Sequence, residues 1–386
     1  MRRNGSKGAP FGLGLVLVGL TVGACGESTS GTPASAEPTS TQAAATSAPS
    51  GAPSAKRAEG APTATESAAT PAPTASAVAT PQTNAVALPA GKNGILAAGQ
   101  ADKLLPVGGK PVVSLIDAGG EPRESLTYDL AKGQKESFSI DMDMTMKMEM
   151  GGKQSPAITM PRMSMLMDLA VKDKSAENDV FIDGVMTGVN VTGTDATQKQ
   201  IADKLKGEMG ALKGLSMQYW VSPKGSVRDA KLTVPAGAPA AAQQMMQGMM
   251  QSMDSMVAPL PGEPVGLGAK WAALTRVTSN GADFLQLSRY TLKARDGSRL
   301  TLDVEIEQVA AKASIDAPGL PPEVKTNLTA IDSGGKGAVT IDLKKLTPAS
   351  SQVKMDMKMS LEVLAQGKKE EMKMEMGMAI GVGGKK

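Results

Sequence analysis

The side chains that could carry out chemistry are of few kinds in this chain of 386 residues, which contains one cysteine, 26 methionines and no histidine. The lack of histidine removes the commonest general base and metal ligand. Sulfur chemistry is limited to one thiol, at Cys25, and to thioethers, which are soft ligands for Cu(I). The obvious carboxylates, Asp141, Asp143 and Glu149, alternate with methionines, so we expect them on a solvent-facing strand surface. We therefore predict that the protein is not an enzyme and needs no cofactor.

The first 24 residues have the layout of an export signal. A basic segment, Met1–Lys7, precedes an apolar run, Phe11–Leu20. This run is shorter than the roughly 20 residues that span a bilayer, and its length suits the apolar region of a signal peptide. Cys25 lies where cleavage would occur, and a single cysteine cannot form an internal disulfide. Covalent modification of Cys25 explains its position better than a free thiol does.

Val22, Gly23, Ala24 and Cys25 resemble the lipobox of bacterial lipoproteins. The resemblance implies diacylglycerol on the sulfur of Cys25, cleavage before Cys25 and acylation of the new N-terminus. Two or more acyl chains anchor a protein stably, whereas one does not. The alternative is an ordinary secretory signal with a chance cysteine. Gly26 is not the aspartate that retains lipoproteins in the inner membrane of enteric bacteria, so we expect a place in the cell envelope, at the outer membrane if the cell has one.

Composition divides the rest of the chain in two. Residues 25–93 are mostly Ala, Pro, Ser, Thr and Gly without an aromatic residue, which predicts a disordered tether because little apolar surface could be buried. Residues 94–386 are long enough for one large domain. The net charge is +3, without a basic block or aromatic platform, so we predict no nucleic-acid partner.

Methionine follows a strict two-residue period. In residues 138–150 every even position is apolar and every odd position is polar, which places the two sets on opposite faces of a strand. Such one-sided burial is typical of antiparallel sheets. Similar alternation occurs in residues 163–171, 300–306, 339–343, 353–363 and 372–380. Turn signals between the runs occur at Gly151-Gly152, Asp296-Gly297, Gly334-Gly335 and Gln366-Gly367.

Two segments, 195–212 and 239–256, have apolar residues at helical spacing. Thr194 or Asp195 could cap the first helix, and Pro259 would end the second. A hairpin of residues 215–221 and 227–234 is expected between them. The pattern therefore predicts a β-rich α+β fold, in which two helices pack on one side of a large antiparallel sheet.

The lipidated N-terminus, the tether and the long antiparallel strands resemble the Lol-type carriers and the mycobacterial lipid-carrying lipoproteins. More closely, Ala118–Arg123, Leu126–Tyr128 and the Met-x-Met strand resemble a family of methionine-rich bacterial lipoproteins of unknown function. The segment Pro264–Trp271 is similar to that family's entry into its second sheet half, and the resemblance covers roughly residues 110–386. The carriers imply a curved half-barrel that holds acyl chains in an apolar concavity.

The methionine rows have three interpretations. They could fill a closed core, because methionine adapts to irregular gaps. They could line an apolar cavity for a lipid or an acylated partner, or their thioethers could bind Cu(I). The candidate cavity residues are Met142, Met144, Met146, Met148, Met165, Met167, Met355, Met357, Met359, Met374 and Met376. We predict a membrane-anchored, non-enzymatic lipoprotein that binds or carries an apolar ligand, with a structural envelope lipoprotein and a copper-binding one as alternatives, and we assign no metal ligand.

Overall fold

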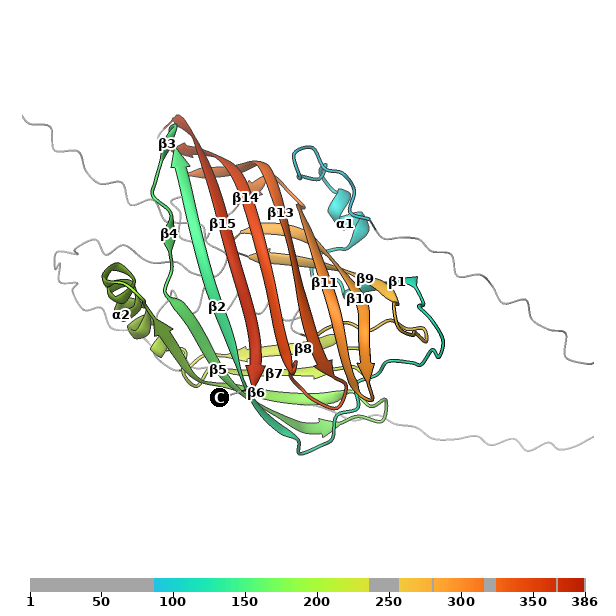
Figure 1. Ribbon diagram of the computed structural model, residues 1–386. Helices are drawn as coiled ribbons and strands as arrows, with labels where there is room; N and C mark the ends of the chain where they lie inside the picture. Colours follow the sequence, from blue (N-terminus) through green and yellow to red (C-terminus); the bar gives the residue numbers. More distant parts are fainter. Residues whose placement is uncertain (1–86, 236–256, 280, 316–323, 366, 385–386) are drawn as a thin grey trace, which may run out of the picture. The chain divides into compact units, whose positions relative to one another are not determined.

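The alternating segments of the sequence form one sheet of fifteen strands in the computed structural model, which describes residues 87–235, 257–279, 281–315, 324–365 and 367–384 (Figure 1). The longest strands are β2 (Lys135–Met150), β5 (Arg162–Lys174), β6 (Val180–Thr192), β10 (Ala282–Asp296), β11 (Arg299–Ala310), β13 (Lys325–Asp342), β14 (Ser350–Ala365) and β15 (Lys368–Gly384). The shorter strands are β1 (Val112–Asp117), β3 (Lys153–Gln154), β4 (Ile158–Thr159), β7 (Ser216–Val221), β8 (Val227–Thr233), β9 (Lys270–Ser279) and β12 (Ser314–Ile315). All six predicted strand segments are therefore confirmed.

The strands pair antiparallel in the order β1-β9-β10-β11-β13-β14-β15-β2-β5-β6-β7-β8. The short strands β3 and β4 pair with β2, and β12 pairs with β13. The sheet is open, with β1 and β8 at its two ends. Figure 1 shows that it curves strongly, because β9 and β10 on one side and β6 to β8 on the other turn behind the long central strands. The predicted curved antiparallel sheet is confirmed.

The concave face of this sheet carries the main hydrophobic core. Met357 of β14 lies opposite Met376 of β15, which in turn lies opposite Met146 of β2, and all three are buried. They belong to the largest cluster of buried apolar side chains. Because all three occupy the apolar register of their strands, the two-residue period correctly assigned them to one face.

The helix predicted at residues 195–212 is α2 (Ala196–Gly210). The carboxylate of Asp195 caps it by accepting a hydrogen bond of 2.8 Å from the backbone N–H of Gln198. The apolar face of α2 is buried in the main core through residues such as Leu205. A short helix that the sequence did not predict, α1 (Gln100–Leu104), covers the other face of β9 and β10. The helix predicted at residues 239–256 lies outside the described residues.

One of the predicted turns is wrong, because Gly334 and Gly335 lie within the continuous strand β13. Both have extended backbones rather than a positive φ. A Cβ atom on Gly335 would lie 2.7 Å from the carbonyl oxygen of Lys354 on β14. Glycine therefore serves the close approach of two strands here, whereas the predicted turns at Gly151-Gly152 and Asp296-Gly297 are confirmed by positive φ angles.

The packed region begins inside the segment that the sequence assigns to the tether. The side-chain amide of Asn93 donates a hydrogen bond of 3.2 Å to the carbonyl of Thr329, and the N–H of Ile331 donates one of 2.9 Å to the carbonyl of Asn93. Leu88 packs against the apolar cluster beneath α1. Residues 88–93 thus belong with the sheet, because one leucine and one asparagine supply contacts that the segment's overall composition conceals.

Candidate functional site

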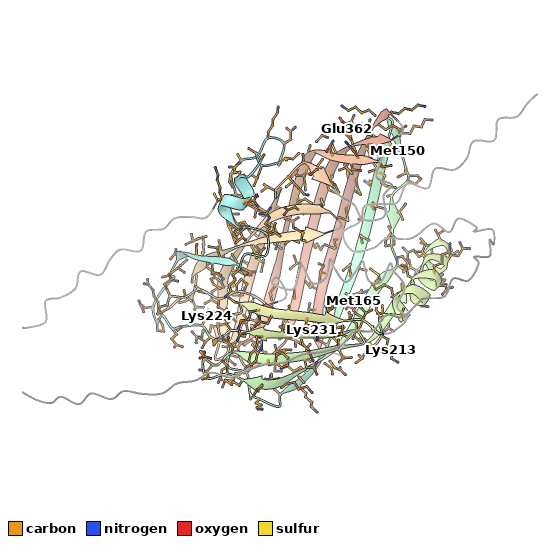
Figure 2. The ribbon with its side chains drawn as sticks, turned by 180° about the vertical axis from the view of Figure 1, so that it is seen from behind. Met150, Met165, Lys213, Lys224, Lys231 and Glu362 are labelled. Atoms are coloured by element: carbon orange, nitrogen blue, oxygen red, sulfur yellow. The ribbon has the colours of Figure 1, made fainter. Side chains whose placement is uncertain are left out.

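A cavity of about 380 Å³ lies against the concave face of the sheet. Its front wall is formed by inward side chains of β2, β5, β11, β13, β14 and β15, and its back wall by β7, β9, β10 and the segment 257–259. In Figures 1 and 2 these two groups of elements lie on opposite sides of the curved sheet's interior. The lining residues are Phe138, Ile140, Leu169, Tyr219, Val257, Ala258, Pro259, Ala273, Thr275, Gln286, Ser288, Tyr290, Val304, Ile306, Val339, Ile341, Leu346, Thr347, Pro348, Ser351, Val353, Ile380 and Val382.

A glycine on β13, Gly337, makes room for the cavity. Gly337 occupies an inward position between Val304 of β11 and Val353 of β14, both of which line the cavity. A Cβ atom on Gly337 would lie 2.2 Å from the carbonyl oxygen of Gln352. The two strands therefore approach closely here, and the inward surface between the two valines carries no side chain.

The back wall is held by hydrogen bonds to the segment 257–259. The phenol of Tyr128 donates to the carbonyl of Ala258 at 3.1 Å, and the indole N–H of Trp271 donates to the carbonyl of Pro259 at 2.9 Å. The Lys224 ammonium donates to the carbonyl of Pro261 at 2.9 Å, and burial lowers the pKa of Lys224. The three side chains thus hold the back wall by donating to backbone carbonyl groups, and none of these contacts places a charged side chain in the cavity lining.

The loop between β13 and β14 forms part of the cavity wall. The Glu136 carboxylate accepts hydrogen bonds from the backbone N–H groups of Leu346 and Thr347, at 3.1 and 3.2 Å, and from the Thr347 hydroxyl at 2.8 Å. Leu346 and Thr347 line the cavity and are half-buried. Glu136 therefore fixes this loop over the free space, and charge-assisted bonds of this kind are stronger than neutral ones.

A row of polar side chains crosses the concave face on β9, β10, β11 and β13. Thr275 lies opposite Gln286, Gln286 opposite Gln308, and Gln308 opposite Ser333. The Ser333 hydroxyl donates to the Gln308 side-chain carbonyl at 2.7 Å, and the Gln308 amide donates to the Gln286 carbonyl at 2.8 Å. The Gln286 amide donates to the Ser288 hydroxyl at 3.2 Å. We call Thr275, Gln286, Ser288, Gln308 and Ser333 the polar row; its first three members line the cavity.

Two tyrosines add hydroxyl groups to the cavity wall. Tyr219 is only 3% exposed, and burial raises its pKa to about 12. Its hydroxyl forms no hydrogen bond within the described residues. In that part of the chain every fully buried side-chain nitrogen or oxygen has a hydrogen-bond partner, so the Tyr219 oxygen is not fully enclosed by protein atoms. The oxygen of Tyr219 therefore borders free space. Burial also raises the pKa of Tyr290 to about 12, partly offset by a hydrogen bond with Ser288.

None of the eleven methionines proposed from the sequence lines this cavity. Seven are buried in the main core, namely Met144, Met146, Met167, Met357, Met359, Met374 and Met376. The remaining four, Met142, Met148, Met165 and Met355, are half-buried. By register Met142 lies opposite Ile380 and Met165 opposite Ile140, so these two border the cavity lining.

The methionine-rich and cavity-lining parts occupy different ends of the same strands. Figure 2 shows that Met150, at the end of β2, lies well apart from Met165 of β5. Met165 lies opposite the lining residue Ile140, so the cavity lies toward Met165. A second, smaller hollow of about 200 Å³ touches Met146, Met357 and Met376. Charged side chains of β2, β14 and β15, including Lys147 and Glu375, also line it. Its mixed lining distinguishes it from the larger, uncharged cavity.

The carboxylates highlighted in the sequence lie on the other face of β2. Arg162 lies 3.4 Å from the carboxylate of Asp141 and 4.0 Å from that of Asp143, and Lys373 lies 3.3 Å from that of Glu149. All three carboxylates are partly or largely exposed, as ion pairs of a solvated strand surface usually are. They take no part in the cavity.

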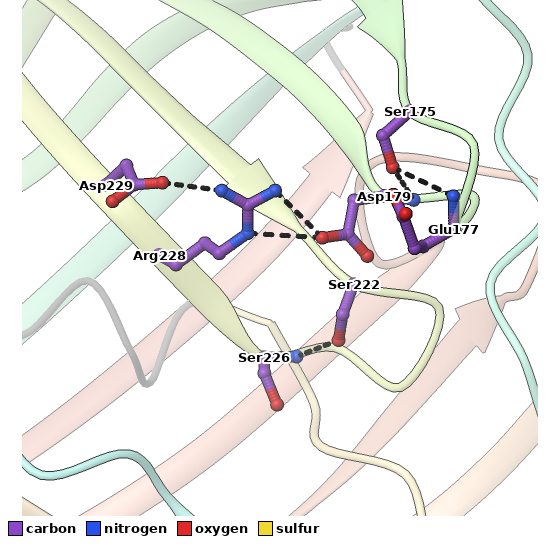
Figure 3. Close-up of polar contacts among 7 residues, drawn as sticks. All are labelled: Ser175, Glu177, Asp179, Ser222, Ser226, Arg228 and Asp229. Carbon is purple, nitrogen blue, oxygen red and sulfur yellow. Dashed lines mark hydrogen bonds and ion pairs between the residues drawn. The ribbon is translucent and has the colours of Figure 1, made fainter. Parts of the chain in front are cut away.

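A separate polar cluster stabilises the end of β6 to β8 (Figure 3). Arg228 donates two hydrogen bonds to the carboxylate of Asp179, at 3.1 and 3.0 Å, and one of 2.5 Å to that of Asp229. Its guanidinium lies 5.0 Å from the ring centre of Trp220, which packs 5.3 Å from Phe181. The guanidinium thus links two carboxylates and ties β8 to the residue before β6, and the three groups together keep one net negative charge.

Sequence reasoning missed the polar lining of the cavity. Gln286 and Ser288 alternate with Leu285 and Leu287, which reads as a strand with its polar face in water. In the structure the leucines pack beneath α1, and the polar residues face the cavity. Only the pair Phe284-Leu285 interrupts the alternation before Gln286, and two residues are too few to indicate a strand covered on both faces.

Cys25 and the lipobox residues Val22, Gly23 and Ala24 lie outside the described residues. In the part of the chain that the structure describes, no helix has the length and apolar character needed to cross a bilayer. Within the same part, no three His, Cys, Asp or Glu side chains are grouped so that they could hold a metal ion. Comparison with protein-family models and with curated proteins gives no match for this chain.

Proposed function

We propose that this chain is a membrane-anchored, non-enzymatic lipoprotein of the cell envelope that binds an apolar ligand in its concave cavity. The ligand would be a lipid or the acyl part of a lipidated partner. The observation that supports the proposal is the cavity itself. Its volume of about 380 Å³ falls within the roughly 300–1,000 Å³ of small-molecule sites, and its lining is mostly apolar.

The size of the cavity limits the ligand. A water molecule takes about 30 Å³ of liquid, so 380 Å³ accommodates about a dozen groups of that size. One medium-length acyl chain fits this space, whereas a complete two-chain lipid would have to extend beyond it. The lining residues Ser351, Val353 and Val382 are half-buried, so we place the exit of such a lipid beside them.

Blocking the cavity tests the binding proposal. Ser351 faces the cavity on β14, whereas its neighbour Gln352 is exposed on the other face. In residues 25–386 carrying Cys25→Ser, Ser351→Trp should abolish binding of a fluorescent acyl probe, and Gln352→Trp should leave it unchanged. Native mass spectrometry would identify any co-purified lipid. Equal probe binding by the two variants would refute the cavity as the site.

The membrane anchor is tested separately on the full chain. We expect Cys25→Ser to accumulate as an unlipidated and uncleaved precursor, because the thiol accepts the lipid. Globomycin, which blocks the lipoprotein signal peptidase, should also accumulate precursor in the unaltered protein. Normal maturation under both conditions, measured by mass spectrometry, would contradict lipidation at Cys25.

A further inference from the structure

We infer that the cavity selects an uncharged amphipath whose polar group is an ester, amide or hydroxyl, and that it rejects a free carboxylate. This inference rests on the proposed function and names the chemical class of its ligand. It follows from two features of the same wall: polar groups that are all neutral, and no charge to balance an ionised ligand.

The neutral polar groups offer hydrogen bonds that the protein itself does not use. A glutamine amide has two N–H donors. Within the polar row, the Gln286 amide gives one of them to Ser288, while its carbonyl oxygen accepts from Gln308. The second N–H of Gln286 and the hydroxyl of Tyr219 are therefore available to a ligand. Both groups line the cavity, and both match a carbonyl oxygen as acceptor.

The described part of the chain places no positively charged side chain in the cavity lining. Among the described residues that line the cavity there is no Lys, Arg, Asp or Glu. The internal stretches outside the described residues, 236–256 and 316–323, contain no Lys or Arg in the sequence. The nearby Lys224 directs its ammonium at the carbonyls of Leu126 and Pro261. A carboxylate would therefore lose its water without gaining a counter-ion, which is strongly unfavourable.

The opposite wall suits the tail of such a ligand. Ile140, Val353, Ile380 and Val382 present only hydrocarbon to the cavity, from β2, β14 and β15. The three cavity-lining members of the polar row stand on β9 and β10, and the tyrosines on β7 and β10, across the free space. One side of the cavity can therefore bind a polar group while the other contacts a hydrocarbon chain. A pure hydrocarbon would leave the second N–H of Gln286 without an acceptor.

The test compares methyl dodecanoate with dodecanoate as displacers of a neutral fluorescent acyl probe from residues 25–386 carrying Cys25→Ser. At pH 8 the ester should bind at least tenfold more tightly than the acid. Because only the protonated acid enters, its affinity should rise as the pH falls toward its carboxyl pKa of about 4 to 5, while the ester's affinity stays constant. Equal affinities at pH 8 would overturn the inference and leave the proposed function standing. Failure of both to displace the probe would reject the proposed function.

Variants locate the polar contact. Gln286→Leu should lower the affinity for the ester about tenfold, and the same change at Gln218, on the other face of β7, should not alter it. Tyr219→Phe removes only the hydroxyl, so it guards against a folding defect in Gln286→Leu and should lower ester affinity by a smaller factor. Unchanged ester affinity in both Gln286→Leu and Tyr219→Phe would refute the assigned wall.

Discussion

The tyrosines provide a direct test of the cavity's environment, because the chain contains three and each has a raised pKa. The phenol of Tyr219 is the most informative, since it is deeply buried and has no hydrogen-bond partner among the described residues. Its pKa of about 12 in the folded protein compares with an ordinary value of 10.0. The neutral phenol is thus the form that the fold favours.

The expected magnitude follows from linkage between ionisation and folding. A shift of one pKa unit corresponds to about 1.36 kcal/mol, so the raised pKa of Tyr219 corresponds to about 3 kcal/mol. This stability is fully present below pH about 10, where the phenol is protonated in both states. It is lost as the pH rises from about 10 to about 12. The loss is a large fraction of the roughly 5–15 kcal/mol that stabilises a typical domain.

The assay is phenolate absorbance at 295 nm, recorded against pH together with circular dichroism. We expect almost no phenolate in the folded protein near pH 10, and a cooperative appearance of all three phenolates when the protein unfolds at higher pH. Tyr219→Phe should remove one third of the final signal and raise the midpoint pH of unfolding. At neutral pH its stability should change by less than about 1 kcal/mol, because no hydrogen bond within the protein is lost.

Two results would refute this reasoning. Phenolate absorbance that rises near pH 10 while the circular dichroism remains native would show that a tyrosine is solvated. A midpoint that does not move in Tyr219→Phe would show that this phenol contributes nothing to alkaline unfolding. Either result would also weaken the case that Tyr219 borders a cavity sheltered from bulk water.

Three further predictions concern stability and are measured by denaturant unfolding. The buried side chains of Arg276 (6% exposed) and Asp283 (8% exposed) form an ion pair at 2.8 Å. Arg276→Ala should lower the free energy of unfolding by about 3–5 kcal/mol, because it leaves the buried Asp283 carboxylate unpaired. The double variant Arg276→Met with Asp283→Leu removes both charges and should cost much less. Met144 is 3% exposed, so Met144→Leu should lower the free energy of unfolding by less than about 1.5 kcal/mol, whereas Met144→Asp should unfold the domain. A folded Met144→Asp variant would mean that this face of the sheet is exposed. Gly337→Ala should cost about 1–3 kcal/mol because of the backbone clash with Gln352, while the control Gly207→Ala, in the exposed part of α2, should be neutral or stabilising.

The sheet could be predicted from the sequence because its signal is local. In β2 and β14 each methionine is followed by a polar residue, so a short window is enough to identify the strand and its buried face. The pairing of these strands involves distant segments, as where Met146 lies opposite Met376. The order of the strands therefore could not be read from the alternation, since many pairings would bury the same face equally well.

The cavity could not be predicted in the same way. In an alternating strand the polar residues usually face solvent, whereas on β10 they face the interior. Gln286 and Ser288 look like the wet face of β10, and Leu285 and Leu287 like its core face. That assignment changes once α1 and Leu96 cover the leucines from outside. Only the tertiary structure reveals that a second apolar layer exists there, so the neutral donors of the cavity had no sequence signal of their own.

The distribution of side-chain types along the strands explains why the cavity and the methionine core occupy different places on one face. Methionine is long and flexible, so it fills the space enclosed by a curved sheet. Toward the other end of β13, β14 and β15 the inward positions become Gly337, Val353, Ile380 and Val382. These side chains are shorter or stiffer, and they cannot reach across the same span. The interior of the curved sheet is therefore filled where methionine is dense and hollow where glycine and β-branched residues replace it. Substituting methionine at the valine positions should shrink the cavity while leaving the strand pairing intact.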